Sequence, residues 1–577
     1  MAARLTTYLV VSIVAATLIA GLMAGAQRDD DGPVDLVVHN AHVFTADADG
    51  STAEAIAIRG NQILRVGHNR EVMRLVRPQT AVVDARGASV LPGFNDSHVH
   101  LIEGALGLDD AQLLGAATLD DLEARVRTWA DAHPDRPWVI GRGWGYHLFP
   151  GGLPTRQFLD SIVPDRPARL LSADGRTAWV NSKALKLAGV SRRTPDPAFG
   201  EVVKDPHTGE PTGILKQSAM ALVGRLLPVP TTDERARALR AASAEATRNG
   251  ITSVQNAGGT RADLEMFDEA RRTGELSLRV YSAITAGGGL FEQELDRLQD
   301  VLDAYPDDPL FKAGALKIVL DGSVEAQTAA TIEPYAGEER AVEPALAADD
   351  LNRMVRLADA RGWQIMTHAA GDRAVRMALD AYAHAVRSNR EPPRGRRHRV
   401  EHAETVAVSD VGRFAAVDAI ASMQLFHATP DRLRIDFWHR NLGAERAARG
   451  WPVGSLANAR TRVTFGSDWP AAPMSPLLAL HTAVNRTTAD GEPEGGWNRA
   501  QRLSLEAAVA AYTSGAAWAS FDEQRKGTIE PGMLADLVVL STDIFAAPPS
   551  RLAEAEVVMT IFDGKIVYRR DGRSLTN

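Results

Sequence analysis

Two kinds of hydrophobic pattern divide the chain. Near both ends, short β-branched runs are separated by Asn-Ala, Asp-Gly and Gly-Asn turns, as in "DLVVHNAHVFTADADG" from Asp35 and "VVMTIFDGKIVY" from Val557. Apolar runs bounded by turn residues predict β-hairpins. Because "IRGNQILRVG" and "FDGKIVY" repeat one turn-then-strand pattern, we expect a single small β domain built from residues 35–92 and 522–577.

In residues 93–521 the pattern changes to helical stretches that precede short apolar runs. "TDERARALRAASAEATRNG" precedes "ITSVQNAG", and "DLNRMVRLADARG" precedes "WQIMTHAAG". Such alternation predicts parallel strands covered by helices. A (β/α)8 barrel fits this length and would place an active site at the carboxyl ends of its strands. A doubly wound sheet is the alternative, but no Gly-rich phosphate loop follows the first strand.

The first 27 residues form a third pattern. Arg4 is followed by no charged residue until Arg28, and Ala24-Gly25-Ala26 resembles a signal-peptidase site. The uncharged run is also about as long as a membrane span, which needs ~20 residues. A cleaved signal peptide and a retained anchor both export the chain beyond an acidic linker at residues 28–34. We therefore expect a periplasmic, extracellular or outward-facing membrane-anchored protein; a buried helix of the folded domain is the third alternative.

Charge and composition limit the ligands and reactions that are possible for this chain. The net charge is −9, and no Lys/Arg-rich block interrupts the mixed distribution of charges, so nothing favours nucleic-acid binding. The 577-residue chain contains no cysteine, which excludes disulfides, thiolate ligands and a cysteine nucleophile. A metal ion would have to be held by nitrogen and oxygen.

Polar side chains follow several of the predicted strands. "PGFNDSHVH" places two histidines one residue apart, so that both point to one face of a strand. Similar positions at or near strand ends complete a set of six: His98, His100, Lys317, His368, His402 and Asp468. Imidazole and carboxylate suit Zn²⁺ and can also hold Fe, Mn or Ni. Since the set exceeds the needs of one tetrahedral ion, we expect one or two divalent metal ions, with zinc the first choice.

Lys317 is unusual within the apolar run "ALKIVLDG". A buried ammonium group is costly, and desolvation lowers the pKa of lysine. A neutral amine can take up carbon dioxide as a carbamate, which could bridge two metal ions. The alternative is an ion pair between Lys317 and Asp321 beside a one-metal site.

The ordered segments "PGFNDSHVH", "ALKIVLDGS", "MTHAAGDRAV", "RVEHAE" and "FGSDWP" resemble the amidohydrolase superfamily, and in particular its amidohydrolase-3 branch, which includes N-substituted formamide deformylase-like proteins. The resemblance runs from about Asp35 to Tyr568. It implies a distorted (β/α)8 barrel with a small β-sandwich formed from both chain ends. It also implies that His98 and His100 bind the more buried metal, that Lys317 is a carboxylated bridge, that His368 and His402 bind a second metal, and that Asp468 is ligand and general base.

Departures from the branch pattern suggest which residues contact the substrate. The branch usually has His where Arg176 stands and Glu where Gln217 stands, and "DGSLGSRTAA" is more typical than the "DGSVEAQTAA" that contains Glu325 and Gln327. Two aromatic-rich loops add further candidates. The full set of expected substrate-binding residues is Trp144, Arg176, Gln217, Glu325, Gln327 and His427.

The expected function is hydrolysis of a non-peptide C–N bond in a small-molecule amide by metal-activated water, with Asp468 moving the proton. An esterase or lactonase on the same site is one alternative, because its tetrahedral intermediate is similar. A catalytically degenerate, envelope-bound binding protein is another, motivated by the pocket departures. Membrane attachment through residues 1–27 and assembly into a homodimer stay open.

Overall fold

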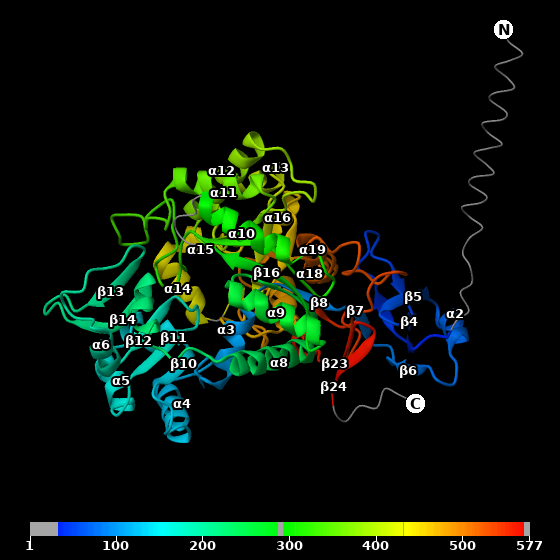
Figure 1. The fold of residues 1–577 in the computed structure, drawn as a ribbon, viewed down its shortest axis with the longest axis horizontal. Coiled ribbons are helices and arrows are strands. Elements are labelled where there is room, and N and C mark those ends of the chain that lie inside the picture. Colours follow the sequence, from blue (N-terminus) through cyan, green and yellow to red (C-terminus); the bar gives the residue numbers. More distant parts are fainter. Residues whose placement is uncertain (1–32, 287–291, 306, 431, 571–577) are drawn as a thin grey trace, which may run out of the picture.

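The computed structural model describes residues 33–286, 292–305, 307–430 and 432–570. At its centre lies a sheet of eight parallel strands in the order β21-β20-β19-β18-β17-β16-β15-β8 (Figure 1). The strands are β8 (Phe94–Val99), β15 (Ile251–Asn256), β16 (Arg279–Thr285), β17 (Phe311–Val319), β18 (Gln364–Ala369), β19 (Arg399–His402), β20 (Ile420–Met423) and β21 (Val463–Phe465). The sheet curls until its first and last strands meet, where the Ser97 hydroxyl donates to the Phe465 carbonyl at 2.7 Å. The expected (β/α)8 fold class is confirmed.

Helices connect successive strands and cover the outside of the barrel. They are α8 (Thr232–Arg248), α9 (Arg261–Thr273), α10 (Glu292–Ala304), α11 (Ala348–Ala360), α12 (Asp372–Ser388), α13 (Val408–Ala416), α14 (Arg432–Leu442), α15 (Ala444–Ala447), α16 (Val453–Asn458), α17 (Pro476–Asn485), α18 (Leu505–Tyr512) and α19 (Ser514–Ala519). Helix α8 begins with a capping box, in which Thr231 and Glu234 each accept from the other's backbone N–H. On α12 the apolar residues Val375, Leu379 and Tyr382 share one buried face, as a barrel-covering helix requires.

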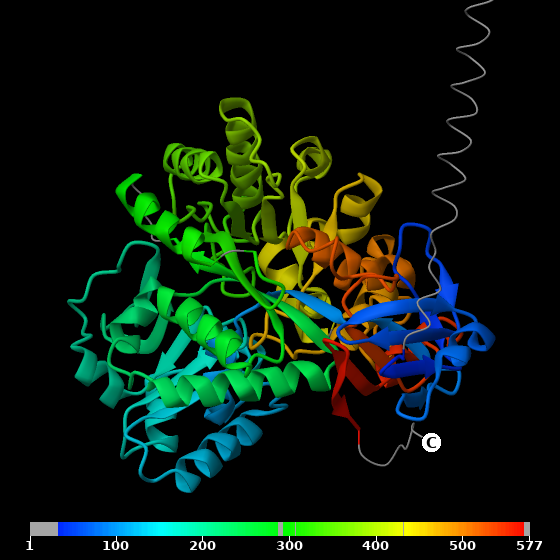
Figure 2. The same ribbon diagram turned by 45° about the vertical axis from the view of Figure 1, so that its right-hand side comes forward.

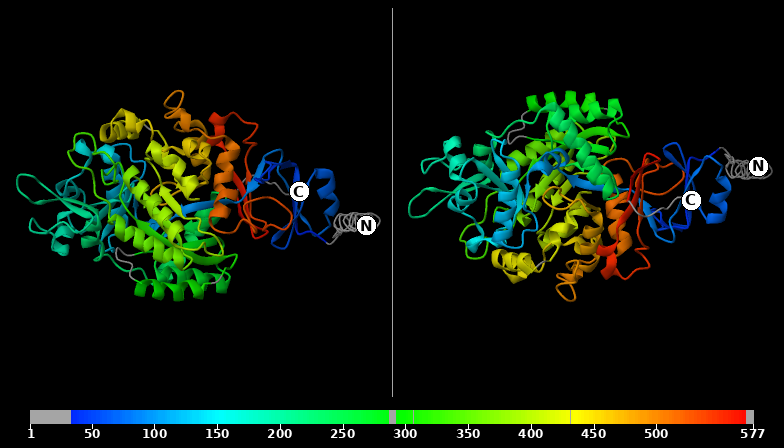
Figure 3. Two further views of the ribbon diagram at one scale, coloured as in Figure 1. Left: turned by 90° about the horizontal axis from the view of Figure 1, so that it is seen from above. Right: turned by 90° about the horizontal axis from the view of Figure 1, so that it is seen from below.

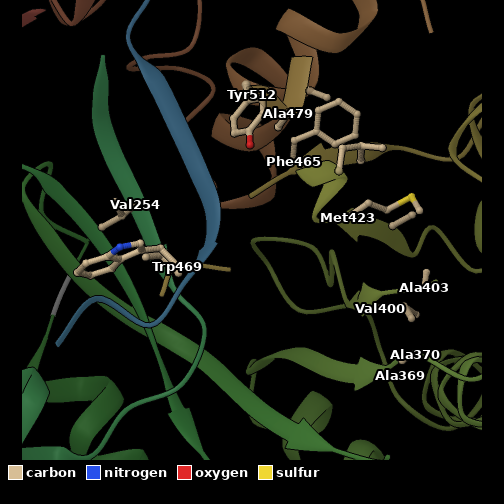
Figure 4. Close-up of a cluster of buried hydrophobic side chains, with 14 of the residues drawn as sticks. Val254, Ala369, Ala370, Val400, Ala403, Met423, Phe465, Trp469, Ala479 and Tyr512 are labelled. Atoms are coloured by element: carbon tan, nitrogen blue, oxygen red, sulfur yellow. The ribbon is translucent and has the colours of Figure 1, made fainter. Parts of the chain in front are cut away.

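Between the barrel and its helices lies the largest hydrophobic cluster. In Figure 4, Phe465 of β21 and Tyr512 of α18 lie next to each other, and their ring centroids are 5.6 Å apart. Tyr512 also packs edge-on against Phe94 of β8, at 5.9 Å. Helix α18 therefore packs against both β8 and β21, the two strands at which the barrel closes.

An insertion separates β8 from α8 and carries its own six-stranded sheet, in the order β13-β14-β12-β11-β10-β9. Its strands are β9 (Ala111–Gln112), β10 (Val139–Trp144), β11 (Ala168–Ser172), β12 (Thr177–Val180), β13 (Gly200–Lys204) and β14 (Pro211–Gln217), and its helices are α3 (Leu101–Leu106), α4 (Leu119–Ala132), α5 (Arg156–Ile162), α6 (Ser182–Ala188) and α7 (Ala221–Gly224). This cyan sheet stands beside the barrel in Figure 2. The hydrophobic pattern did not predict it as a separate sheet, because short runs such as Ala168–Ser172 look like barrel strands.

Both ends of the described chain build two further sheets, ordered β5-β4-β1-β6 and β24-β23-β22-β7-β2-β3. Their strands are β1 (Leu36–His39), β2 (His42–Phe44), β3 (Thr52–Ala53), β4 (Ala55–Arg59), β5 (Gln62–Gly67), β6 (Ala81–Asp84), β7 (Ser89–Pro92), β22 (Leu537–Leu540), β23 (Val557–Phe562) and β24 (Lys565–Arg569), and α2 (Asn69–Val72) follows β5. Strands β7 and β22 pair antiparallel. Val38, Ile58 and Ile561 from the two sheets share one core, so the sheets form a sandwich.

The sandwich and the insertion lie on opposite sides of the barrel (Figure 3). A buried ion pair ties the sandwich to the start of β16, where Arg279 donates to Asp536 at 2.6 and 2.9 Å. The same guanidinium donates to Asp563 at 2.9 Å. No helix within the described residues is long and apolar enough to cross a membrane. The signal peptide or anchor expected at residues 1–27 lies outside the described residues.

Candidate active site

The carboxyl end of β8 supplies two imidazoles. The fully buried His98 donates from Nδ1 to the carboxylate of Glu401 at 2.6 Å, so its Nε2 carries the lone pair. That Nε2 lies 3.4 Å from Oδ1 of Asp468, and Nε2 of His100 lies at the same distance from the same oxygen. Burial, and secondarily Lys317, lowers the pKa of His98 to about 4. The imidazole is therefore neutral and able to act as a ligand at neutral pH.

These three residues form a metal-ligand cluster among the described residues: one donor atom each from His98, His100 and Asp468 lies within 4.8 Å of the others. Two imidazole nitrogens and a carboxylate oxygen are ligands that Zn²⁺ and its neighbours prefer. Three protein ligands also leave a coordination position open for water or substrate, as catalytic metal sites do. The donor set present in the chain therefore fits a divalent ion.

His98 is held by a buried pair, Glu401 and Arg399, on the side of its ring that faces away from Asp468. Arg399 donates to the two carboxylate oxygens of Glu401 at 2.7 and 3.0 Å, and both side chains are fully buried. Burial acts to raise the pKa of Glu401, but the charge of Arg399 and the hydrogen bond from His98 outweigh it and hold that pKa well below its usual range. A charged Glu401 fixes the tautomer of His98. Sequence reasoning missed this pair, although the alternation in "RVEH" places Arg399 and Glu401 on one face of β19.

Asp468 follows β21 in a left-handed conformation, with φ of 59°. Its backbone N–H donates to the carbonyl of His98 at 2.8 Å, and its Oδ2 accepts from Nε2 of His427 at 3.2 Å. Burial acts to raise the pKa of Asp468, but contacts from His100 and His427 outweigh it and hold that pKa well below its ordinary value. The residue is a carboxylate at neutral pH, as a ligand or a base must be.

Lys317 reaches the same centre from β17. Its Nζ lies 3.3 Å from Nε2 of His98, and burial lowers its pKa to about 8. The carboxylate of Asp321 instead accepts the backbone N–H groups of Ala330, Ala370 and Gly371 at 2.8 to 3.0 Å. Within the described part of the chain, Lys317 and Asp321 share no ion pair, so the geometry disfavours the ion-pair alternative.

His368 and His402 lie next to the cluster but do not belong to it. Their ring centroids are 4.2 Å apart, and the His402 ring is 4.9 Å from that of His98. Both nitrogens of His368 have neighbours. Nη2 of Arg176 lies 2.8 Å from Nδ1 and 3.5 Å from Nε2. The Gly322 carbonyl and the Asp321 carboxylate lie 3.0 and 3.5 Å from Nε2. Nε2 of His402 is buried without a hydrogen-bond partner in the described structure. All six residues expected at the metal site thus lie close together, but only His98, His100 and Asp468 form the ligand cluster found among the described residues.

Two cavities meet above this centre. The smaller, of about 270 Å³, lies over His368, His402 and Asp468. The larger, of about 750 Å³, opens beside His100 and Lys317. Asp468 and Arg176 line both cavities and stand between them.

The expected substrate-binding residues divide into two groups. Arg176, Glu325 and His427 line the smaller cavity. Trp144 does not line either cavity, because the alternation of β10 turns it into the core of the insertion, where its indole N–H donates to the Leu170 carbonyl at 3.0 Å.

The two glutamines also lie away from both cavities. Gln217 donates to the Thr328 hydroxyl at 3.0 Å, and the exposed Gln327 donates to Asn441 at 3.1 Å. Each amide joins neighbouring loops, and neither residue lines the two cavities.

Sequence reasoning missed two acidic residues of the smaller cavity. Asp174 accepts from the hydroxyls of Tyr146 and Ser323 at 3.1 and 2.5 Å, and from the backbone N–H of Arg176. Glu404 is buried, and its Oε2 has no hydrogen-bond partner among the described residues. Glu404 stands in "RVEHAE" two positions after His402, so proximity to an expected ligand was its only signal.

Comparison with known proteins places this chain in a family. The model of the amidohydrolase family matches residues 81–568. Protein LONG AFTER FAR-RED 3 of Arabidopsis thaliana is 33% identical over 92% of this chain and 91% of its own. N-substituted formamide deformylase of Arthrobacter pascens is 29% identical over 93% of this chain and 99% of its own.

A solved structure supports the fold. The uncharacterized metal-dependent hydrolase from Pyrococcus horikoshii OT3 superposes with a TM-score of 0.69, at 24% identity, over 89% of this chain and 99% of its own. The match covers most of this chain and supports the fold described above. The match to the family model and the similarity to N-substituted formamide deformylase confirm the resemblance to the amidohydrolase-3 branch.

Proposed function

We propose, from the premise that this chain belongs to the amidohydrolase family, that it is an exported metal-dependent enzyme hydrolysing a non-peptide C–N bond in a small-molecule amide. The observation that carries the proposal is the convergence of His98, His100 and Asp468 beside the two cavities. Zinc is the ion that the donor set suits first. Export rests on the signal-like pattern of residues 1–27.

When bound at this centre, a divalent ion lowers the pKa of water and so supplies a nucleophile near neutral pH. The chain's own residues supply the proton transfers. Asp468 accepts the proton of the attacking water on its carboxylate and returns it to the leaving nitrogen. His427, 3.2 Å from Oδ2, holds that carboxylate in position.

The developing negative charge on the carbonyl oxygen needs a donor that is already in place. Arg176 fulfils this requirement, because its guanidinium lies between the two cavities and is held by His368. A carbamate on Lys317 would in addition need a second ion to bridge. The number of ions at the centre therefore decides the state of Lys317.

The bond type is the finer part of the proposal. Its support is the activity for which a relative, N-substituted formamide deformylase, is named; this chain matches that relative over nearly its full length. N-substituted formamides and other N-acyl amines are accordingly the first substrates to test. Esters and lactones are the competing class, since attack on their carbonyl passes through a similar tetrahedral intermediate.

The test is a panel of N-formyl and N-acyl amines and matched esters, assayed with the zinc-loaded protein. We expect hydrolysis of at least one amide, faster than its ester counterpart, and loss of this activity in Asp468→Asn. Asp349→Asn, an exposed Asp-to-Asn change on α11, is the matched control and should keep the wild-type rate. Turnover confined to esters would reject the C–N assignment, and wild-type turnover in Asp468→Asn would reject the mechanism.

A further inference from the structure

We propose that this chain binds one divalent ion, at His98, His100 and Asp468, and that the guanidinium of Arg176 takes the place of a second cation beside His368. The inference rests on the metal centre of the proposed function. It concerns a residue at which this chain departs from the pattern of its branch, where His is usual. It replaces the expectation of two ions bridged by Lys317.

The two ring nitrogens of His368 have different roles. A neutral imidazole has one N–H donor and one lone pair. The carbonyl of Gly322, 3.0 Å from Nε2, can only accept, so Nε2 carries the hydrogen. The remaining lone pair is on Nδ1, and Nη2 of Arg176 lies over the ring, 2.8 Å from Nδ1 and 3.5 Å from Nε2. A metal ion bound to Nδ1 would therefore lie directly beside the guanidinium.

The charge of Arg176 also opposes a metal ion at His368. A guanidinium stays protonated in proteins, so Arg176 places a permanent positive charge within hydrogen-bond distance of His368. A divalent cation bound at the same imidazole would be repelled by it. Of the two imidazoles on this side, His402 alone keeps an unpartnered Nε2, and one imidazole does not make a metal site.

Hydrogen bonds hold the backbone of Arg176 in this position. It lies in the turn between β11 and β12, where its backbone N–H donates to Asp174 at 3.1 Å and its carbonyl accepts from the backbone N–H of Gln217 at 3.0 Å. Asp174 is itself fixed by the hydroxyls of Tyr146 and Ser323. These contacts fix the backbone of Arg176, so the insertion presents this residue to the barrel, where its guanidinium contacts His368.

With a single ion there is nothing for a carbamate to bridge. Lys317 then remains an amine that donates to Nε2 of His98 in the metal-free protein, at 3.3 Å. The positive charge that a second ion would have supplied on the far side of the centre comes from Arg176.

The experiment counts metal per chain. Wild type, Arg176→His and the exposed control Arg193→His are stripped, reloaded with excess zinc, desalted and analysed by inductively coupled plasma mass spectrometry. We expect one zinc per chain in wild type and in Arg193→His, and two in Arg176→His. Two zinc ions in wild type would overturn the inference. One in both wild type and Arg176→His would overturn the role given to Arg176.

A second measurement covers the case in which Arg176→His does not fold. Wild-type protein loaded with Mn²⁺ should give the six-line electron paramagnetic resonance spectrum of isolated ions, and a spin-coupled pair would overturn the inference. Neither readout depends on turnover. One ion with no amide hydrolysis would therefore reject the proposed function alone, whereas two ions with hydrolysis would reject this inference alone.

Discussion

Glu401→Gln removes one charge from beneath the metal-ligand cluster and changes almost nothing else. The glutamine keeps the size of the side chain and an oxygen that can accept from His98. It loses the charge that pairs with Arg399 at 2.7 Å. The side chains of His98, Arg399 and Glu401 are all fully buried. The substitution therefore tests whether Glu401 sets the orientation and basicity of His98.

Two effects of this change can be sized. Loss of the carboxylate behind a ligating histidine typically lowers metal affinity by about 10- to 100-fold, or about 1.4–2.7 kcal/mol. Independently, a buried Arg399 without its partner destabilises the fold by about 3–5 kcal/mol. With an unfolding entropy of about 2.1 cal/mol/K per residue, a chain of this length should lose only about 2–4 °C in Tm. The affinity change is thus the more sensitive readout.

The assay is competition for zinc against a chromophoric chelator, accompanied by thermal unfolding of the metal-free protein. Glu523→Gln is the matched control, since it breaks a glutamate–arginine pair with Arg397 at 2.6 Å that is only partly buried and far from β8 in sequence. That control should cost about 0–1 kcal/mol and leave zinc affinity unchanged. Wild-type zinc affinity in Glu401→Gln would refute the orienting role of Glu401.

Three further substitutions or truncations have defined outcomes. Asp468→Asn should lower kcat by about 100-fold or more while the circular dichroism spectrum is kept, and a wild-type kcat would reject the base assignment. Deletion through Ala26 should leave a soluble, folded enzyme, and an insoluble product would show that the N-terminal segment belongs to the fold. Trp144→Phe should lose about 1 kcal/mol of stability with the hydrogen bond to Leu170, measured by urea unfolding, and an altered KM would contradict its placement in the core.

The convergence of the six expected metal-site residues could be predicted from sequence because it follows from barrel geometry. Residues two apart on a strand share a face, which brings His98 and His100 together. The carboxyl ends of parallel barrel strands meet on one rim, which brings in Lys317, His368 and Asp468 from distant parts of the chain. No detail of side-chain packing is needed for either step.

What could not be predicted depends on how the insertion docks. Arg176 and His368 are 192 positions apart in the sequence, and the pattern of neither segment predicts their contact. The aromatic loop around Trp144 looked exposed because it is rich in glycine, yet β10 buries that indole completely. Glu401 was overlooked for the opposite reason, since a buried carboxylate within a strand is recognisable only once Arg399 and His98 are seen around it.

The most direct test of the central claim is a zinc titration of the stripped wild-type protein, followed by the initial rate of amide hydrolysis on the most active substrate of the panel. We predict no hydrolysis without metal, a rate that rises with added zinc to a plateau, and no such rise in Asp468→Asn. Hydrolysis by the metal-free protein at the rate of the reloaded one would contradict it.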